Sequence, residues 1–151
     1  MGYRVAVLMG SPNDGDKMAP AAATLERYGI DADVRVMSAH RSPKLVSEFV
    51  SGAREAGYQA IICGAGMAAH LAGAVAAQTT LPVIGVPLSG GAINGWDSLL
   101  ATVQMPKGIP VATVAVDGAM NAALLVVQML GISDPALVAE LEAHRAEMVP
   151  K

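Results

Sequence analysis

The sequence predicts an α/β fold of three layers, in which helices cover both faces of a parallel five-stranded sheet. Five short segments rich in apolar or β-branched residues are separated by longer segments with a helical pattern. This alternation is typical of strand–helix–strand units, whose strands lie parallel. The third and fourth segments are almost continuously apolar, as strands buried on both faces of a sheet are. The predicted strands are residues 4–9, 31–36, 60–63, 82–86 and 111–115.

The first half of the chain contains two strand–helix units. The first strand ends at a loop rich in Gly, Pro and short polar residues, and a helical pattern over 16–28 follows, which Gly29 is placed to end. The second strand alternates polar and apolar residues. After the next loop, Pro43 is suited to the first turn of a helix. Apolar residues then recur at helical spacing until Gly57, namely Leu45, Val46, Phe49, Val50 and Ala53.

The second half of the chain continues the alternation. A helix of small residues follows the third strand to about Gln78, and a short helix near 98–103 precedes the fifth strand. The pattern over 121–130 is apolar nearly all round, which predicts a helix buried on more than one side and therefore a contact between subunits. A more charged helix over 135–148 follows. We expect one domain over residues 1–151, with the flavodoxin-like strand order 2-1-3-4-5 and an additional C-terminal helix.

The composition favours an oligomer and argues against a nucleic-acid partner. Hydrophobic residues make up 53% of the chain and charged residues 15%, against about a quarter charged in an ordinary soluble domain. So little charge covers a small domain poorly, and we therefore expect apolar surface to be buried between identical subunits. The net charge is -3, and the aromatic residues are one Trp, three Tyr and one Phe. A nucleic-acid surface needs a basic stripe and often stacking rings, which this sequence lacks.

Residues 56–96 contain no Asp, Glu, Lys or Arg, which raises the alternative of a membrane protein. Gly and Pro residues interrupt this segment, so no apolar run reaches the ~20 residues of a spanning helix. The first residues lack the basic and apolar regions of an export signal. The single cysteine, Cys63, excludes an intrachain disulfide. We therefore expect no membrane partner and a cytoplasmic location.

The segment from Ser38 to Pro43 is the first candidate site. It follows a strand and offers a hydroxyl at Ser38, an imidazole at His40 and a guanidinium at Arg41 within four positions. Imidazole is suited to moving protons near neutral pH, and guanidinium is suited to holding an anion. Loops at the carboxyl ends of parallel strands form the ligand crevice of such sheets. The alternative is an ordinary loop histidine beside an arginine that forms a surface ion pair.

Two further loops are candidates, and each has an ordinary alternative. The loop after the first strand presents Ser11 and Asp14 at a helix N-terminus, where an anion or a sugar could bind, although both residues could simply cap the helix. His70 lies in a loop of Gly and Ala that lets a flat ligand approach the backbone, or else it bonds to the start of the next helix. His40 and His70 lack a partner at any metal-ligand spacing, so no metal is expected. His144, on the charged last helix, is expected in solvent.

Six segments carry further motifs, in this order: Gly10-Ser11 with Asp14 and Met18; residues 38–43; 64–66 with 68–71; 82–87; 97–100 with 103–106; and 121–125. Together they strongly resemble the class I N5-carboxyaminoimidazole ribonucleotide mutase family of purine biosynthesis. Six matching segments in order are far more specific than any one of them. The resemblance implies conversion of N5-carboxyaminoimidazole ribonucleotide to 4-carboxy-5-aminoimidazole ribonucleotide, which moves a carboxylate from nitrogen to carbon. It also implies a flavodoxin-like subunit, no cofactor and a homo-octamer.

By position, the resemblance implies a role for each candidate residue. His40 would be the acid and base of the reaction. The residues that would hold the ribonucleotide are Ser11, Asp14 and Arg41, with Ser38 and Ala39 beside them. Those that would line the pocket for the ring and the carboxylate are Gly66, His70 and Leu71.

The chain departs from the family pattern at Asn13, Met67 and Ala72, where Ser, Gly and Pro are usual, and its loop at 116–119 is short. None of these departures removes a residue assigned to chemistry, although Met67 could narrow the pocket. Two alternatives remain. One is a class II enzyme that carboxylates aminoimidazole ribonucleotide directly with CO2, and the loop at 66–71 favours class I over it. The other is a non-catalytic flavodoxin-like protein that binds nucleotides.

Overall fold

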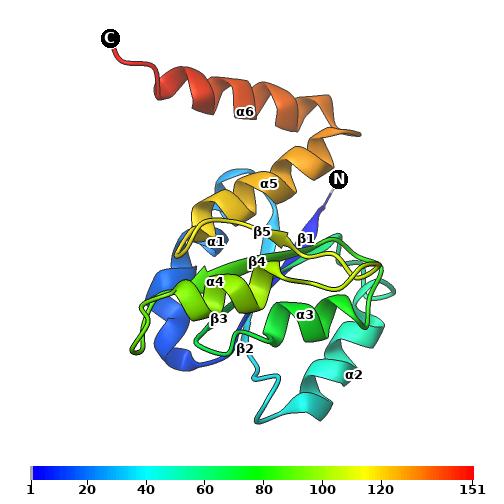
Figure 1. Ribbon diagram of the computed structural model, residues 1–151. Coiled ribbons are helices and arrows are strands. Elements are labelled where there is room, and N and C mark those ends of the chain that lie inside the picture. The colour runs from blue at the N-terminus through cyan, green and yellow to red at the C-terminus, as the bar shows by residue number, and fades with distance from the viewer. Residues whose placement is uncertain (1) are drawn as a thin grey trace.

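The computed structural model describes residues 2–151 and confirms the predicted fold class. Five strands form one parallel sheet in the predicted flavodoxin-like order β2-β1-β3-β4-β5, with helices on both faces (Figure 1). The strands are β1 (Arg4–Met9), β2 (Asp31–Val36), β3 (Ala60–Gly66), β4 (Val83–Leu88) and β5 (Ala112–Thr113). The helices are the short 3-10 turn η1 (Pro12–Asp14), α1 (Gly15–Arg27), α2 (Pro43–Ala53), α3 (Leu71–Ala76), α4 (Trp96–Val103), α5 (Ala119–Gly131) and α6 (Pro135–Glu147).

The sheet is the middle of three layers. Successive strand residues point to opposite faces, so Val5 and Val7 of β1 belong to the core shared with α1 and α5, whereas Ala6 and its neighbours on that face belong to the core shared with α2 and α3. α4 lies on the α3 side of β4 (Figure 1). There the backbone of Gly85 is so close to α4 that a Cβ would fall 2.3 Å from the methyl carbon of Thr102.

β3 is longer than predicted, because the glycine-rich residues after Cys63 continue the strand instead of forming a loop. The segment from Gly64 to Gly66 pairs with the last three residues of β4. Packing explains the first of these glycines: a Cβ on Gly64 would fall 2.3 Å from the sulfur of Met18 in α1. The prediction that the strand ends at Cys63 is therefore wrong. The glycine allows a helix to lie close to the sheet, and the loop begins only at Met67.

β5 is shorter than the predicted strand at 111–115, because only Ala112 and Thr113 pair with β4. The chain stays beside β4 a little further, since the N–H of Val114 donates to the carbonyl of Gly85 at 3.2 Å. It then turns at Asp117, whose φ of +59° no regular strand contains. The fifth strand is thus cut short by a turn that carries Asp117 back over the end of β4.

The last two helices are attached differently. α5 lies against α1 and the sheet, and it buries Ala122, Ala123, Val126 and Val127 within the subunit. Its apolar pattern is therefore largely explained inside one chain, where the sequence predicted a subunit contact. α6 packs on α5 and projects away from the sheet (Figure 1). None of the helices in residues 2–151 combines the length and the apolar character needed to cross a bilayer.

The prediction that His144 lies in solvent is wrong. Its side chain is half-buried, and its Nδ1 atom is shielded from solvent without a hydrogen-bond partner in the described part of the chain. The reason is the placement of α6. α6 packs on α5, and an exposed ion pair of 3.0 Å joins Glu147 at its end to Arg27 of α1. That side of the charged helix is consequently covered.

Candidate active site

The loops that follow β1, β2, β3 and β4 surround a cleft of about 410 Å³ at the carboxyl edge of the sheet. This is the edge where open parallel sheets bind ligands. Every residue that the sequence assigned to the site lies there. They are Ser11, Asp14, Ser38, Ala39, His40, Arg41, Gly66, His70 and Leu71.

In the first loop, Ser11 caps a helical turn, and both Ser11 and Asp14 line the cleft. Ser11 is the N-cap of η1, and its Oγ accepts a hydrogen bond from the N–H of Asn13 at 3.2 Å. The Ser11 hydroxyl still has its own hydrogen to donate to a ligand. Burial raises the pKa of Asp14 above its ordinary value, while hydrogen bonding at the Ser11 backbone and the charge of Lys17 act in the opposite direction. Asp14 is thus a partly desolvated acceptor at the cleft.

Hydrogen bonds within the second loop fix its shape, and they do not involve the side chains of His40 and Arg41. The N–H of Met37 donates to the carbonyl of Met9 at 2.9 Å, which fixes the start of the loop to β1. Ser38 Oγ accepts from the N–H of Arg41 at 3.1 Å, and Ser42 Oγ donates to the Ser38 carbonyl at 3.1 Å. The side chains of His40 and Arg41 are exposed at the cleft. Short-range hydrogen bonds of serine therefore set the shape of this loop.

Arg41 lies at the cleft with an exposed side chain. Among the ion pairs of residues 2–151, none involves Arg41. A guanidinium beside an open cleft presents several N–H donors in a fork that fits a phosphate. The alternative interpretation of Arg41 as the partner of a surface carboxylate is therefore wrong for this structure.

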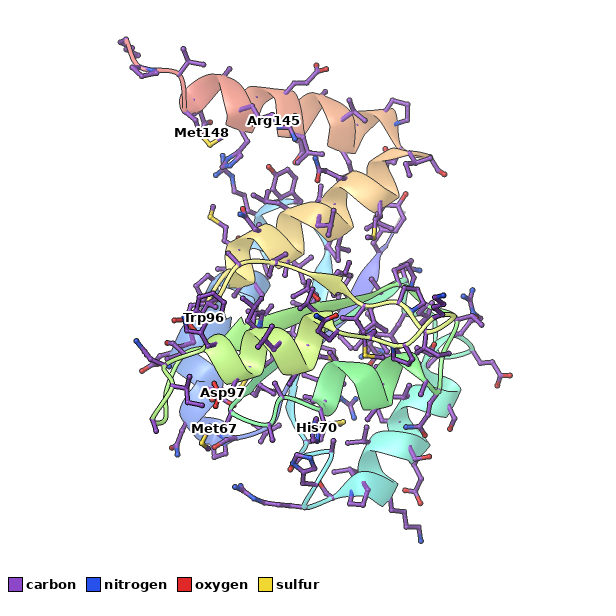
Figure 2. The ribbon with its side chains drawn as sticks, viewed as in Figure 1. Met67, His70, Trp96, Asp97, Arg145 and Met148 are labelled. Carbon is purple, nitrogen blue, oxygen red and sulfur yellow. The ribbon has the colours of Figure 1, made fainter. Side chains whose placement is uncertain are left out.

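His40 and His70 meet across the cleft, which the sequence did not predict. Their nitrogens His40 Nε2 and His70 Nδ1 are 2.6 Å apart, and the ring centroids are 4.7 Å apart with an interplanar angle of 87°. At this separation one nitrogen carries the hydrogen and the other accepts it. His70 lies on the loop before α3, at the lower edge of the molecule in Figure 2. The pair joins the second and third loops across the cleft.

The third loop narrows the cleft. Met67 adopts a left-handed φ of +51°, which is unusual for a residue with a side chain. Its exposed side chain lies beside Gly91, since a Cβ on Gly91 would fall 3.1 Å from Met67 Cγ. Leu71 is buried at the base of the same loop. The methionine that replaces the usual glycine therefore reaches from the third loop to the fourth.

The fourth loop was missed by the sequence analysis. Ser89, Gly90 and Gly91 follow β4 directly and line the cleft. The rule that applied to the other three loops would have found them, because they also follow a parallel strand. Two more residues, Lys17 and Asp117, bond to Ser89 without lining the cleft. Asp117 carried no recognisable signal, whereas Lys17 is three positions after Asp14 and so shares its side of the helix start.

The comparisons with known proteins agree with this geometry. The sequence model of the AIR carboxylase family matches residues 4–151. The chain belongs to the AIR carboxylase family. A curated relative from Mycobacterium tuberculosis, named N5-carboxyaminoimidazole ribonucleotide mutase, is 56% identical over 142 residues, which are 94% of this chain and 82% of the relative. A relative of the same name from Pyrococcus abyssi is 50% identical over 145 residues, covering 96% and 83%.

The fold is shared by a solved structure. The crystal structure of Treponema denticola PurE is similar with a TM-score of 0.87 at 25% identity, covering 96% of this chain and 90% of that chain. The resemblance found in the sequence is therefore confirmed at the level of family and fold.

Proposed function

We propose that this member of the AIR carboxylase family is an isomerase of purine biosynthesis, which converts N5-carboxyaminoimidazole ribonucleotide to 4-carboxy-5-aminoimidazole ribonucleotide. Relatives with the mutase name at 56% and 50% identity over most of the chain support this reaction. The observation that carries the proposal is the pairing of His40 with His70 at 2.6 Å in the cleft where the predicted ligand-binding residues meet.

The reaction needs proton transfer and no change of oxidation state. The bond between the exocyclic nitrogen and the carboxylate breaks, its electron pair stays on the nitrogen, and CO2 is formed. His40 gives the nitrogen a proton. The ring carbon then attacks CO2 with the electrons of the electron-rich ring, and the hydrogen on that carbon leaves as a proton that returns to His40. One imidazole can serve as acid and base in succession.

His70 assists His40 in this account. Because the two rings share one hydrogen across 2.6 Å, His70 holds the His40 ring in one orientation and fixes which nitrogen carries the hydrogen. The contact uses His40 Nε2, so Nδ1 of the same ring is the nitrogen that would face the ligand. This is the role of an orienting group in general acid–base catalysis.

The rest of the cleft binds the ribonucleotide and confines CO2. Arg41 and the Ser11 hydroxyl hold the phosphate, and Asp14 accepts hydrogen bonds from ribose hydroxyls. Ser38 and Ala39 shape the loop around them. Gly66, Leu71 and His70 line the part of the cleft in which CO2 would stay next to the ring carbon and away from water. The mechanism requires no cofactor.

The experiment that tests the proposal is an assay of the purified protein on the two candidate substrates. We expect turnover of N5-carboxyaminoimidazole ribonucleotide without added CO2. Turnover that requires free CO2 with aminoimidazole ribonucleotide, and that ignores the N-carboxylated substrate, would establish direct carboxylation instead. Binding of the ribonucleotide with no turnover of either substrate would establish a binding protein.

The proposal includes a homo-octamer that works in the cytoplasm. A stripe of exposed apolar residues on one face of α4 supports self-association, because Trp96, Leu100 and Val103 are 66%, 49% and 46% exposed at helical spacing. Figure 2 shows Trp96 at the start of α4, on the outside of the subunit. The buried thiol of the single cysteine, Cys63, suits a reducing compartment. A monomer in sedimentation at working concentration would contradict the octamer, and recovery of the protein outside the cytoplasmic fraction would contradict the location.

A further inference from the structure

The loop Ser89–Gly91 forms one wall of the cleft. Two charged residues that do not line the cleft, Lys17 and Asp117, form hydrogen bonds to Ser89. Lys17 Nζ, on the first turn of α1, donates to the Ser89 carbonyl at 2.5 Å and to Ser89 Oγ at 3.1 Å. Asp117 accepts from the other side: its Oδ1 accepts from the Ser89 N–H at 2.9 Å, and its Oδ2 accepts from Ser89 Oγ. Every polar backbone and side-chain group of Ser89 is thereby engaged between one cation and one anion.

The two residues after Ser89 are glycines, so they have no side chains that could anchor them. Gly90 and Gly91 have φ values of +136° and +66° and carry no side chain that could pack against the body of the protein. Gly91 touches the side chain of Met67 on the third loop, which is itself exposed. The position of this wall therefore depends on the bonds that Lys17 and Asp117 make to Ser89.

A backbone hydrogen bond and a turn fix the position of Asp117. Its N–H donates to the Pro87 carbonyl at 2.8 Å, so the turn that ends the β5 segment is bonded to the end of β4. Its left-handed φ is one that Asp and Asn tolerate better than most residues. The carboxylate is consequently aimed at Ser89 by the backbone and not by a flexible side chain alone.

We propose that Lys17 and Asp117 are positioning residues that fix the Ser89–Gly91 wall and thereby keep CO2 in the cleft until the ring carbon captures it. This inference rests on the proposed function. CO2 is neutral and has no charge by which the protein can grip it, so its retention depends on closed walls. When a wall loosens, the nitrogen–carboxylate bond still breaks and the nitrogen is still protonated. CO2 then leaves, and aminoimidazole ribonucleotide is released in place of the carboxylated product.

The test is the partition between these two products. The variants Lys17→Met and Asp117→Asn each remove a charge and keep the size of the side chain, and Asn also tolerates the left-handed backbone. We expect the ratio of aminoimidazole ribonucleotide to carboxylated product to rise about tenfold in each variant, which corresponds to about 1.4 kcal/mol in the competing barriers. The KM for the substrate should change little, because neither residue lines the cleft.

Matched controls separate positioning from general destabilisation. Lys107→Met and Asp31→Asn change exposed residues of the same types that make no bond to Ser89, Asp31 lying at the amino end of β2, and their partition ratio should equal that of the wild type. Lys17→Arg keeps a cation that can reach Ser89 and should restore most of the retention. Since both residues hold the same serine, the double variant should raise the ratio by less than the product of the two single effects.

The outcomes distinguish this inference from the proposed function. A loss of rate with an unchanged product ratio in Lys17→Met and Asp117→Asn would overturn the positioning role, because a merely less stable enzyme makes both products in the wild-type ratio. A wild-type protein that does not isomerise the substrate at all would overturn the proposed function first. Thermal unfolding of each variant shows that the protein measured is folded.

Discussion

The two sides of the cleft are built in opposite ways. On the side of β2 and β3, the side chains of His40, Arg41 and His70 reach directly into the cleft from loops that short-range hydrogen bonds brace. On the side of β4, the wall is backbone with almost no side chain, and Lys17 and Asp117 hold it from behind. The difference indicates that the two sides have different functions. In the proposed function, one side performs chemistry and binding, and the other confines CO2.

The largest effect should come from breaking the chemical side at His40. His40→Asn removes the proton-transfer group while keeping a polar side chain of similar size, so we expect turnover to fall at least about 10³-fold. Binding of the ribonucleotide, measured by calorimetry, should remain within a few-fold, because Arg41 and Ser11 are untouched. His144→Asn is the matched control and should keep wild-type turnover. Near-normal turnover of His40→Asn would instead support a binding protein.

A smaller effect should follow from removing the charge of Arg41, the proposed partner of the substrate phosphate on the same side. Arg41→Met should raise the KM about tenfold to a hundredfold with a lesser change in kcat, since charge-assisted hydrogen bonds to a phosphate are lost. Arg145→Met is the control, because Arg145 lies on α6 far from the cleft (Figure 2). An unchanged KM in Arg41→Met would remove Arg41 from the binding site and weaken the distinction between the two sides.

The packing of α1 on the sheet can be perturbed by a substitution at Gly64. Gly64→Ala places a methyl group where the Met18 side chain lies, and this pushes α1, which carries Lys17, away from the sheet. We expect the free energy of unfolding to fall by about 1–3 kcal/mol. Gly52→Ala on α2 is the control, since a Cβ there meets nothing within 4 Å. Equal stability of both variants in denaturant titrations would show that α1 is not held as closely as described.

The smallest effect concerns the charge of Asp117. Burial acts to raise its pKa, but the two hydrogen bonds from Ser89 and the charge of Lys17 outweigh it and hold the pKa below the ordinary value of 3.8. A carboxyl whose pKa is lower in the folded state stabilises the fold above its unfolded pKa, and this contribution is lost as the pH falls through the folded pKa. Unfolding midpoints of the wild type and Asp117→Asn should therefore differ slightly at pH 6 and converge as the pH falls below the ordinary carboxyl pKa of 3.8. A difference that grows toward acid would contradict this.

The sequence predicted one side of the cleft much better than the other. His40, Arg41 and Asp14 follow strands directly, so the rule that loops after parallel strands meet at one edge was enough to gather them. The bonds of Lys17 and Asp117 to Ser89 join residues 72 and 28 positions apart, and no local pattern encodes such pairs. The pairing of the two histidines is likewise a tertiary contact.

The errors in the strand boundaries have the same origin. Gly64 and Gly66 have the local signature of a turn, yet they lie in β3 because they pair with the end of β4, and the missing side chain of Gly64 makes room for Met18 of α1. His144 was expected in solvent because its own helix is charged, yet it is half-buried in a helix that packs back on α5. Local composition predicts an element, whereas packing between elements decides where it ends and what it covers.

The central claim is that CO2 passes from nitrogen to carbon without leaving the cleft. The most direct test supplies the substrate with a ¹³C label in its carboxylate, in buffer that contains unlabelled bicarbonate, and follows the label by NMR. We predict that most of the 4-carboxy-5-aminoimidazole ribonucleotide formed retains the label. Product whose carboxylate comes mainly from the buffer would contradict the account, because it would show that CO2 exchanges with the solvent before the ring carbon captures it.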